Sequence, residues 1–221
     1  MEGEAVFSVL GLAFGLGLLH ALDADHILAV TTLACTRPRR RAALAFCGRW
    51  ALGHGLTLFA IGGAVLLLGL AVPRELSHWA ERLVGVVLLM VGAWVLVDLV
   101  RQRLRLGVHR HAGMPAHAHW RTPSASRGHG HGAVLVGVVH GAAGSAPLLA
   151  VLPVAATGAP LLGLAYLLVF GLAVLAMMLV CGGLLGQVWG RLPANGRWLA
   201  GIRALVATGA LAFGAHWLAG A

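Results

Sequence analysis

The sequence HALDADH, residues 20–26, places two imidazoles and two carboxylates inside an apolar run that covers about residues 5–33. A run of this length can cross a bilayer as a helix. An ionisable side chain at membrane depth costs roughly 3 kcal/mol or more, so such groups usually face an interior path and mark function. We therefore expect residues 20–26 to form a functional site and the rest of the chain to form the walls of that site.

The composition is that of an integral membrane protein. Of the 221 residues, 59 % are hydrophobic and only 10 % are charged, whereas about a quarter are charged in a typical soluble domain. Apolar stretches recur between short polar loops, which predicts an all-α membrane protein with six transmembrane helices. The expected helices cover residues 5–33, 43–71, 81–100, 133–152, 161–189 and 198–218.

The arginines predict the topology. All 16 basic residues are arginine, and most lie in the first, third and fifth loops. By the positive-inside rule these loops are cytoplasmic. We therefore expect a multi-pass protein of the cell (inner) membrane with both termini on the outer side of that membrane. The net charge of +9 is explained by topology, and we expect no nucleic-acid partner. The acidic N-terminus has no cleavage site and predicts no secretory signal peptide.

A short internal similarity suggests two related halves. The sequence GLLHA at residues 17–21 resembles GVVHG at residues 137–141, each within the first helix of a three-helix group. Two such groups would have opposite orientations, the inverted repeat of many secondary transporters. We divide the chain into a first half with the site motif (1–100), a cytoplasmic His/Arg-rich loop (101–132) and a second half (133–221).

The cluster in the first helix has the chemistry of a divalent-metal site. On a regular helix His20, Asp23 and His26 share one stripe and Asp25 points away. If the helix is unwound between His20 and Asp25, Asp25 and His26 can turn in as well, and the sequence does not choose between these geometries. Imidazoles with a few oxygen ligands suit Ni(II), Co(II), Zn(II) or Cu(II) better than Mg or Ca.

Other polar residues within the membrane extend the candidate site. His54, between two glycines on the second expected helix, is our first candidate for a ligand from another helix. His140 is a possible second-half ligand or relay, as is Ser145 in the segment HGAAGSAP at residues 140–147. Pro147 predicts a helix break whose freed carbonyls line a cavity, although small residues also allow close helix packing.

At these residues the chain resembles the nickel/cobalt transporter family. The family signature H-A-x-D-A-D-H-I is matched by HALDADHI at residues 20–27, and LGHGLT at residues 52–57 is similar to a second family motif. The resemblance implies that His20, Asp25 and His26 are essential for metal selection, with His54 assisting. An arginine often precedes the first motif, but here it is Leu19, and later acidic motifs are absent. The chain therefore resembles a short relative near the urease-accessory and efflux-type branches.

The third loop contains three His-x-His pairs within a polar stretch that we expect to be flexible. Imidazoles at this density bind Ni, Zn or Cu weakly, which suggests a cytoplasmic metal-handling loop. A solvated loop that merely adds positive charge is the alternative. The six histidines are His109, His111, His117, His119, His129 and His131.

We expect a secondary permease, not an enzyme, that carries a divalent transition-metal cation, nickel or cobalt, as cargo and holds no cofactor. The direction of transport stays open, and cytosolic metallochaperones or metalloenzyme maturation factors are possible partners. An intramembrane metal-dependent hydrolase or a His-Asp acyltransferase is the alternative, but the loops are short for a catalytic domain. An anion exporter would leave Asp23 and Asp25 unexplained.

Overall fold

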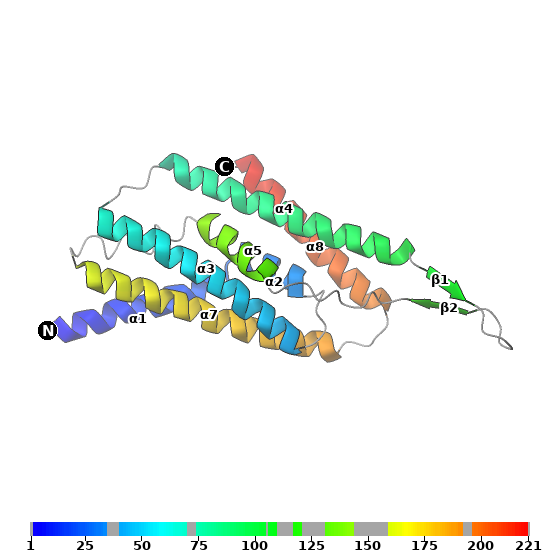
Figure 1. Ribbon diagram of the computed structural model, residues 1–221, viewed down its shortest axis with the longest axis horizontal. Coiled ribbons are helices and arrows are strands. Elements are labelled where there is room, and N and C mark those ends of the chain that lie inside the picture. The colour runs from blue at the N-terminus through cyan, green and yellow to red at the C-terminus, as the bar shows by residue number, and fades with distance from the viewer. Residues whose placement is uncertain are drawn as a thin grey trace.

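The computed structural model describes residues 2–34, 40–69, 74–104, 106–109, 117–120, 131–143, 159–191 and 196–220. These residues form helices joined to one short hairpin, and both termini lie toward the end of the molecule away from that hairpin (Figure 1). The elements in chain order are α1 (Glu2–His20), α2 (Ala24–Ala34), α3 (Arg40–Leu68), α4 (Arg74–Leu104), β1 (Leu106–His109), β2 (His117–Trp120), α5 (His131–Ala143), α7 (Pro160–Arg191) and α8 (Gly196–Gly220).

Four helices form the larger bundle. The long helix α3 packs along α7 and α5, and α1 packs along α7. Their shared core holds Trp50, Tyr166 and Phe170, all with at most 5 % of their surface exposed. Small residues allow the helices to approach closely, because any side chain at Gly137 would overlap the backbone of Trp50.

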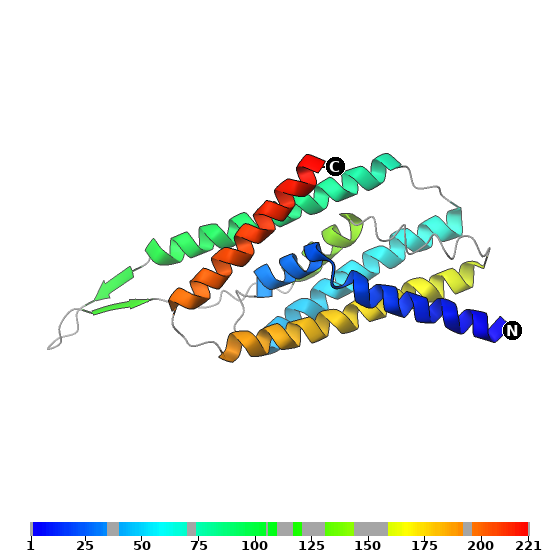
Figure 2. The same cartoon turned by 180° about the vertical axis from the view of Figure 1, so that it is seen from behind.

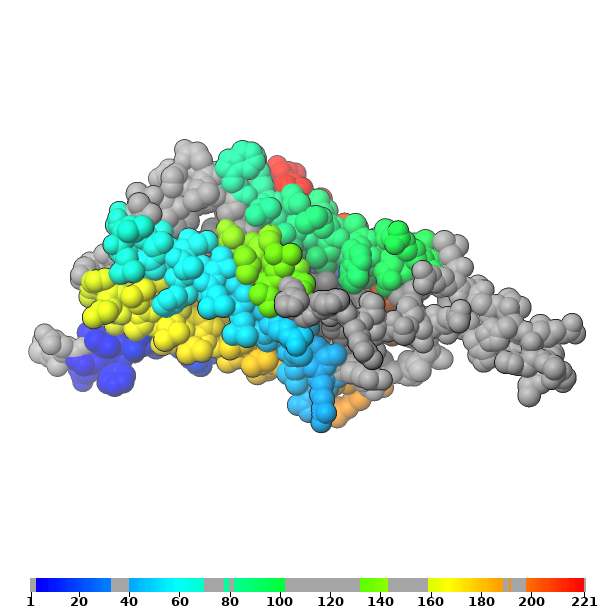
Figure 3. Space-filling model, in the orientation of Figure 1, coloured from blue at the N-terminus to red at the C-terminus, as the bar shows by residue number. Residues whose placement is uncertain are grey.

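The helices α4 and α8 form a second unit. Their backbones cross closely at Gly85 and Gly214, where a methyl group on either glycine would lie within 3 Å of the other's carbonyl oxygen. The short helices α2 and α5 lie between this pair and the long helices α3 and α7 (Figures 1 and 2). In the space-filling view α5 occupies the seam between α3 and α4 (Figure 3).

The pair of α4 and α8 buries an ion pair that the sequence analysis did not anticipate. The Arg203 side chain of α8 is 8 % exposed and donates from Nη2 to Asp98 Oδ2 of α4 at 2.8 Å. Asp98 thus ties two helices together near the start of α8, and Arg203 is retained in an apolar seam by this partner.

The loop between the two halves contains regular structure. An antiparallel hairpin, β1–β2, pairs His109 with His117 and Gly107 with His119. The two short strands were not expected in this loop, and the flexibility expected of its histidine stretch stays a prediction. The regular elements of the described residues are otherwise all helices, as predicted.

The helices are those of a membrane protein. Five of them, α1, α3, α4, α7 and α8, contain apolar segments long enough to cross a bilayer. The apolar part of α5, Gly132–Ala142, is shorter. Since residues 144–158 are outside the described ranges, the sixth span and Pro147 kink stay predictions.

Candidate metal centre

The HALDADH sequence does not form a regular helix. α1 ends at His20, residues 21–23 form a turn, and α2 begins at Ala24. The turn is closed by the Leu22 amide, which donates to the Leu19 carbonyl at 2.9 Å, and the Asp23 carbonyl accepts the first helical bond of α2 from Ile27 at 3.0 Å. Of the two geometries that the sequence left open, the structure has the broken one, and the break brings His20 and His26 together.

Three imidazoles from three helices converge. His54 Nε2 lies 3.4 Å from His20 Nε2 and 3.4 Å from His26 Nε2. Bonds of about 2.0–2.1 Å to a tetrahedral metal ion would separate two neighbouring nitrogens by about 3.3 Å. The spacing therefore fits a transition-metal ion at the centre of the three nitrogens, which we name the histidine triad.

Two carboxylates fix the outer side of this triad. Asp23 Oδ2 accepts a hydrogen bond from His20 Nδ1 at 2.8 Å, and Asp25 Oδ1 accepts one from His26 Nδ1 at 3.0 Å. Since a carboxylate only accepts, each ring carries its proton on Nδ1 and turns the lone pair of Nε2 toward the centre. Carboxylates commonly orient metal-binding histidines in this way. Asp23 is 57 % exposed and contacts His20 from outside the triad.

His140 joins the cluster from the second half of the chain. Its Nε2 donates to Asp25 Oδ2 at 3.1 Å, so Asp25 connects His140 with His26. Asp25, His26 and His140 form a second group whose ligand atoms lie within 4.8 Å of one another. α5 reaches this position because Gly141 packs directly against the backbone of His54.

Aromatic rings enclose the cluster. Trp50, one turn before His54 on α3, stacks on the His54 ring at 5.1 Å and meets His26 edge-on at 5.2 Å. On another side Phe170 of α7 stacks on His20 at 5.4 Å. The sequence analysis missed both rings, although the four-residue spacing of Trp50 and His54 places them on one helix face.

The cluster is deeply buried and its polar atoms are not all paired. His26, His54 and His140 are each 1 % exposed. His54 Nδ1, His140 Nδ1 and Trp50 Nε1 have no hydrogen-bond partner within the described part of the chain. Since buried polar atoms are normally satisfied, these groups favour water molecules as further partners at the edge of the site.

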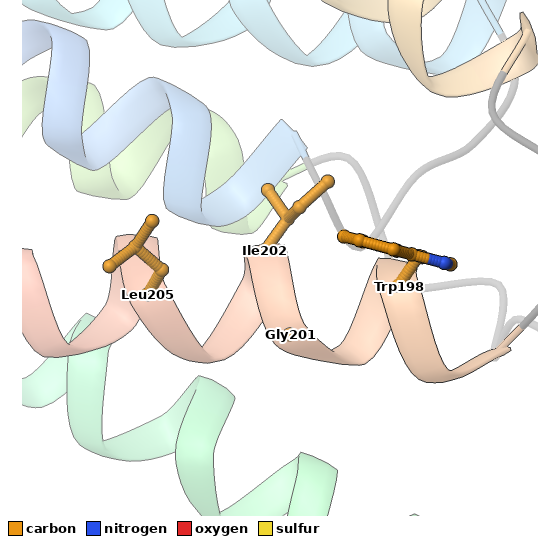
Figure 4. Close-up of a pocket in the computed structure, with 4 residues that line it drawn as sticks. All are labelled: Trp198, Gly201, Ile202 and Leu205. Carbon is orange, nitrogen blue, oxygen red and sulfur yellow. The ribbon is translucent and has the colours of Figure 1, made fainter.

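The remaining candidates lie elsewhere. Ser145, His111 and His129 are outside the described residues, whereas His109, His117 and His119 lie in the hairpin and His131 begins α5. A separate hollow of about 340 Å³ is lined by Trp198, Gly201, Ile202 and Leu205 on the side of α8 that faces α2 (Figure 4). Its lining is apolar and includes no residue of the cluster.

Comparison with known proteins agrees with the architecture. Residues 26–212 match the model of the family described as the cytochrome c biogenesis protein transmembrane region. The chain is 30 % identical over 189 residues to the urease accessory protein UreH of Bacillus sp. (strain TB-90), covering 84 % of this chain and 79 % of that protein. No solved structure matches significantly. The chain therefore belongs to this family of membrane proteins and is a homologue of urease accessory protein UreH, which confirms its predicted kinship with the urease-accessory branch.

Proposed function

We propose that the protein is a secondary permease for a divalent transition-metal cation, with nickel or cobalt as cargo. One observation carries the proposal: the buried His54 Nε2 lies 3.4 Å from the Nε2 atoms of both His20 and His26, whose other ring nitrogens are held by carboxylates. His20, His26 and His54 would bind the ion, and Asp23 and Asp25 would orient the first two rings. His54 lies midway along α3, about 21 Å from either end, which suits a site at the bilayer midplane.

Nickel and cobalt are favoured by the donor set and by the family resemblance of the HALDADHI motif. Nitrogen-rich sites bind late first-row divalent ions in preference to Mg or Ca. UreH is named as a urease accessory protein, and a metal supply role for this chain would agree with that name. A cytosolic metallochaperone or a maturation factor would then be its partner.

The description of the matching family names cytochrome c biogenesis, which suggests a different role. The side chains that meet in the buried cluster are imidazoles and carboxylates, and among the described residues neither metal-binding group includes a cysteine. This donor set favours metal transport over thiol chemistry and over an intramembrane enzyme.

Several contacts support an inverted repeat of two three-helix halves. Gly17 of α1 packs against the backbone of Phe170 in α7, and Gly137 of α5 packs in the same way against Trp50 and His54 of α3. Each half thus places its GxxH segment on the long helix of the other half. Gly55 and Gly171 face one another where α3 packs on α7, since a methyl group added to either would lie 3.9 Å from the Cα of the other, as expected for elements related by a pseudo-two-fold axis.

A sixth span that begins with α5 and a relay role for Ser145 remain parts of this proposal. The termini lie outside the cell membrane and the hairpin lies in the cytoplasm. The loop histidines would collect or release metal there, because the hairpin register sets His109 opposite His117. Rocking of the two halves about the midplane site would alternate its access.

The test is flux of radiolabelled nickel and cobalt in proteoliposomes, measured in both directions with and without an imposed pH gradient. We expect saturable flux of one or both ions, lost in His26→Ala and retained in His216→Ala, a matched change at an exposed histidine of α8. The proposal fails if the purified protein neither binds these ions in calorimetry nor moves them in either direction.

A further inference from the structure

His26 belongs to both metal-binding groups, but it faces them with different atoms. Its Nε2 faces His54 at 3.4 Å within the histidine triad. Its Nδ1 faces Asp25 Oδ1 at 3.0 Å, and the other oxygen of Asp25 lies 3.1 Å from His140 Nε2. The two nitrogens of one imidazole direct their lone pairs to different sides of the ring.

An ion about 2 Å from one of these nitrogens cannot also lie on the lone-pair axis of the other. One ion can therefore occupy only one of the two groups at a time. We infer that Asp25, His26 Nδ1 and His140 Nε2 form a second metal position, and that a single divalent transition-metal ion passes between this position and the histidine triad across the His26 ring. This inference rests on the proposed transport function.

The second position has suitable ligands. Its atoms are spaced at 3.0 and 3.1 Å, close to the separation of neighbouring ligands around a six-coordinate ion with bonds of about 2.1 Å. It contributes one carboxylate and two imidazoles, a donor set that binds Ni, Co or Zn. His26 and His140 are 1 % exposed, so few water molecules compete with the protein ligands.

The two positions differ in the parts of the molecule that build them. The histidine triad uses α1, α2 and α3, all from the first half of the chain. The second position adds α5, from the second half. A relative movement of the halves would therefore change the second position most, which gives the rocking motion a direct effect on the ion.

Transfer of the ion between the two positions needs no net gain or loss of protons. With the ion in the histidine triad, His26 carries its proton on Nδ1 and His140 carries its proton on Nε2, and both donate to Asp25. With the ion in the second position, each ring carries its proton on the other nitrogen, moved by exchange with water. The metal–nitrogen bonds to His20, His54 and His26 Nε2 would break as bonds to Asp25, His140 Nε2 and His26 Nδ1 form.

The test uses Co(II) as the probe, with the full-length protein in detergent for binding and in proteoliposomes for flux. His140→Ala should still bind one Co(II) through the intact histidine triad, within about threefold of the wild-type affinity, while flux falls at least about tenfold. His140→Cys should add a thiolate-to-cobalt charge-transfer band, because residue 140 then contacts the ion. The band should strengthen when His54→Ala is combined with it, since the ion is then driven to the second position.

The matched control is His216→Cys, which places the same thiol on an exposed face of α8 and should add no band. Flux of His140→Ala within twofold of wild type would overturn the inference. Loss of flux without a band in His140→Cys would also overturn it, and would leave His140 as a positioning residue for Asp25. If the wild-type protein shows neither Co(II) binding nor flux, the transport proposal itself fails. If the double variant does not fold, the single His140→Cys spectrum decides.

Discussion

The larger bundle and the pair of α4 and α8 are built from similar apolar helices, but they use buried polar groups differently. In the pair, Arg203 and Asp98 neutralise each other across one seam. In the bundle, Asp25 contacts two imidazoles, while His54 Nε2 lies 3.4 Å from the Nε2 atoms of both His20 and His26. The Arg203–Asp98 pair joins two opposite charges, whereas the converging imidazole nitrogens have the spacing of ligands around a cation. Imidazoles at this spacing make the bundle, and not the α4–α8 pair, the candidate binding site.

Removing a triad ligand should have the largest effect. His26→Ala deletes the ring shared by both metal groups, so Ni(II) and Co(II) affinity should fall by more than about 100-fold, beyond the loss typical for an outer partner. Calorimetry on purified protein measures this affinity. If His26→Ala instead binds Ni(II) and Co(II) within tenfold of the wild-type affinity, the buried imidazoles of the bundle are not a metal site. His216→Ala should bind as the wild type does.

Removing an orienting carboxylate should have a smaller effect. Asp23→Ala leaves all three triad nitrogens but frees the His20 ring to rotate, so metal affinity should fall about 10-fold, within the 10–100-fold range for residues that orient a metal ligand. A loss as large as that of His26→Ala, in the same titration, would instead make Asp23 a direct ligand. Asp23→Asn keeps an acceptor and should recover part of the affinity.

The ion pair should affect stability and leave metal binding unchanged. Arg203→Leu removes the 2.8 Å charged hydrogen bond to Asp98, a loss of about 1.5–3 kcal/mol in the free energy of unfolding. Thermal unfolding in detergent should shift down, while Co(II) affinity stays within about twofold, because neither residue contacts the cluster. A changed Co(II) affinity in a well-folded variant would mean that packing of α4 against α8 influences the metal site.

The sequence predicted where the buried polar site lies, but it did not predict the helix break, the Asp98–Arg203 pair or the hairpin. Four ionisable residues in one apolar run identify the site, and the glycines around His54 predict its close approach. Sequence periodicity could not show that the helix breaks at His20, since HALDADH contains neither glycine nor proline. The Asp98–Arg203 pair joins residues 105 positions apart, which no local pattern reveals. The hairpin was missed because its composition is that of a disordered loop.

Deleting residues 110–131 should change the apparent affinity for cytoplasmic metal by a few fold at most and leave maximal flux unchanged. Weakly binding loop imidazoles would alter the local metal concentration, but in the proposed pathway the ion must still pass the buried cluster. The measurement is flux against metal concentration added to the hairpin side of inside-out vesicles.

The smallest effect is expected for a thiol. Cys181 of α7 is partly buried and is not a member of either metal-binding group in the described residues. Cys181→Ser should therefore leave nickel and cobalt flux within about twofold of wild type, because Ser conserves the volume and the site keeps every imidazole. If this variant instead loses flux while Co(II) still binds, the Cys181 thiol is coupled to transport. A thiol-dependent role, as the family description of cytochrome c biogenesis suggests, would then explain the bundle better than simple permeation.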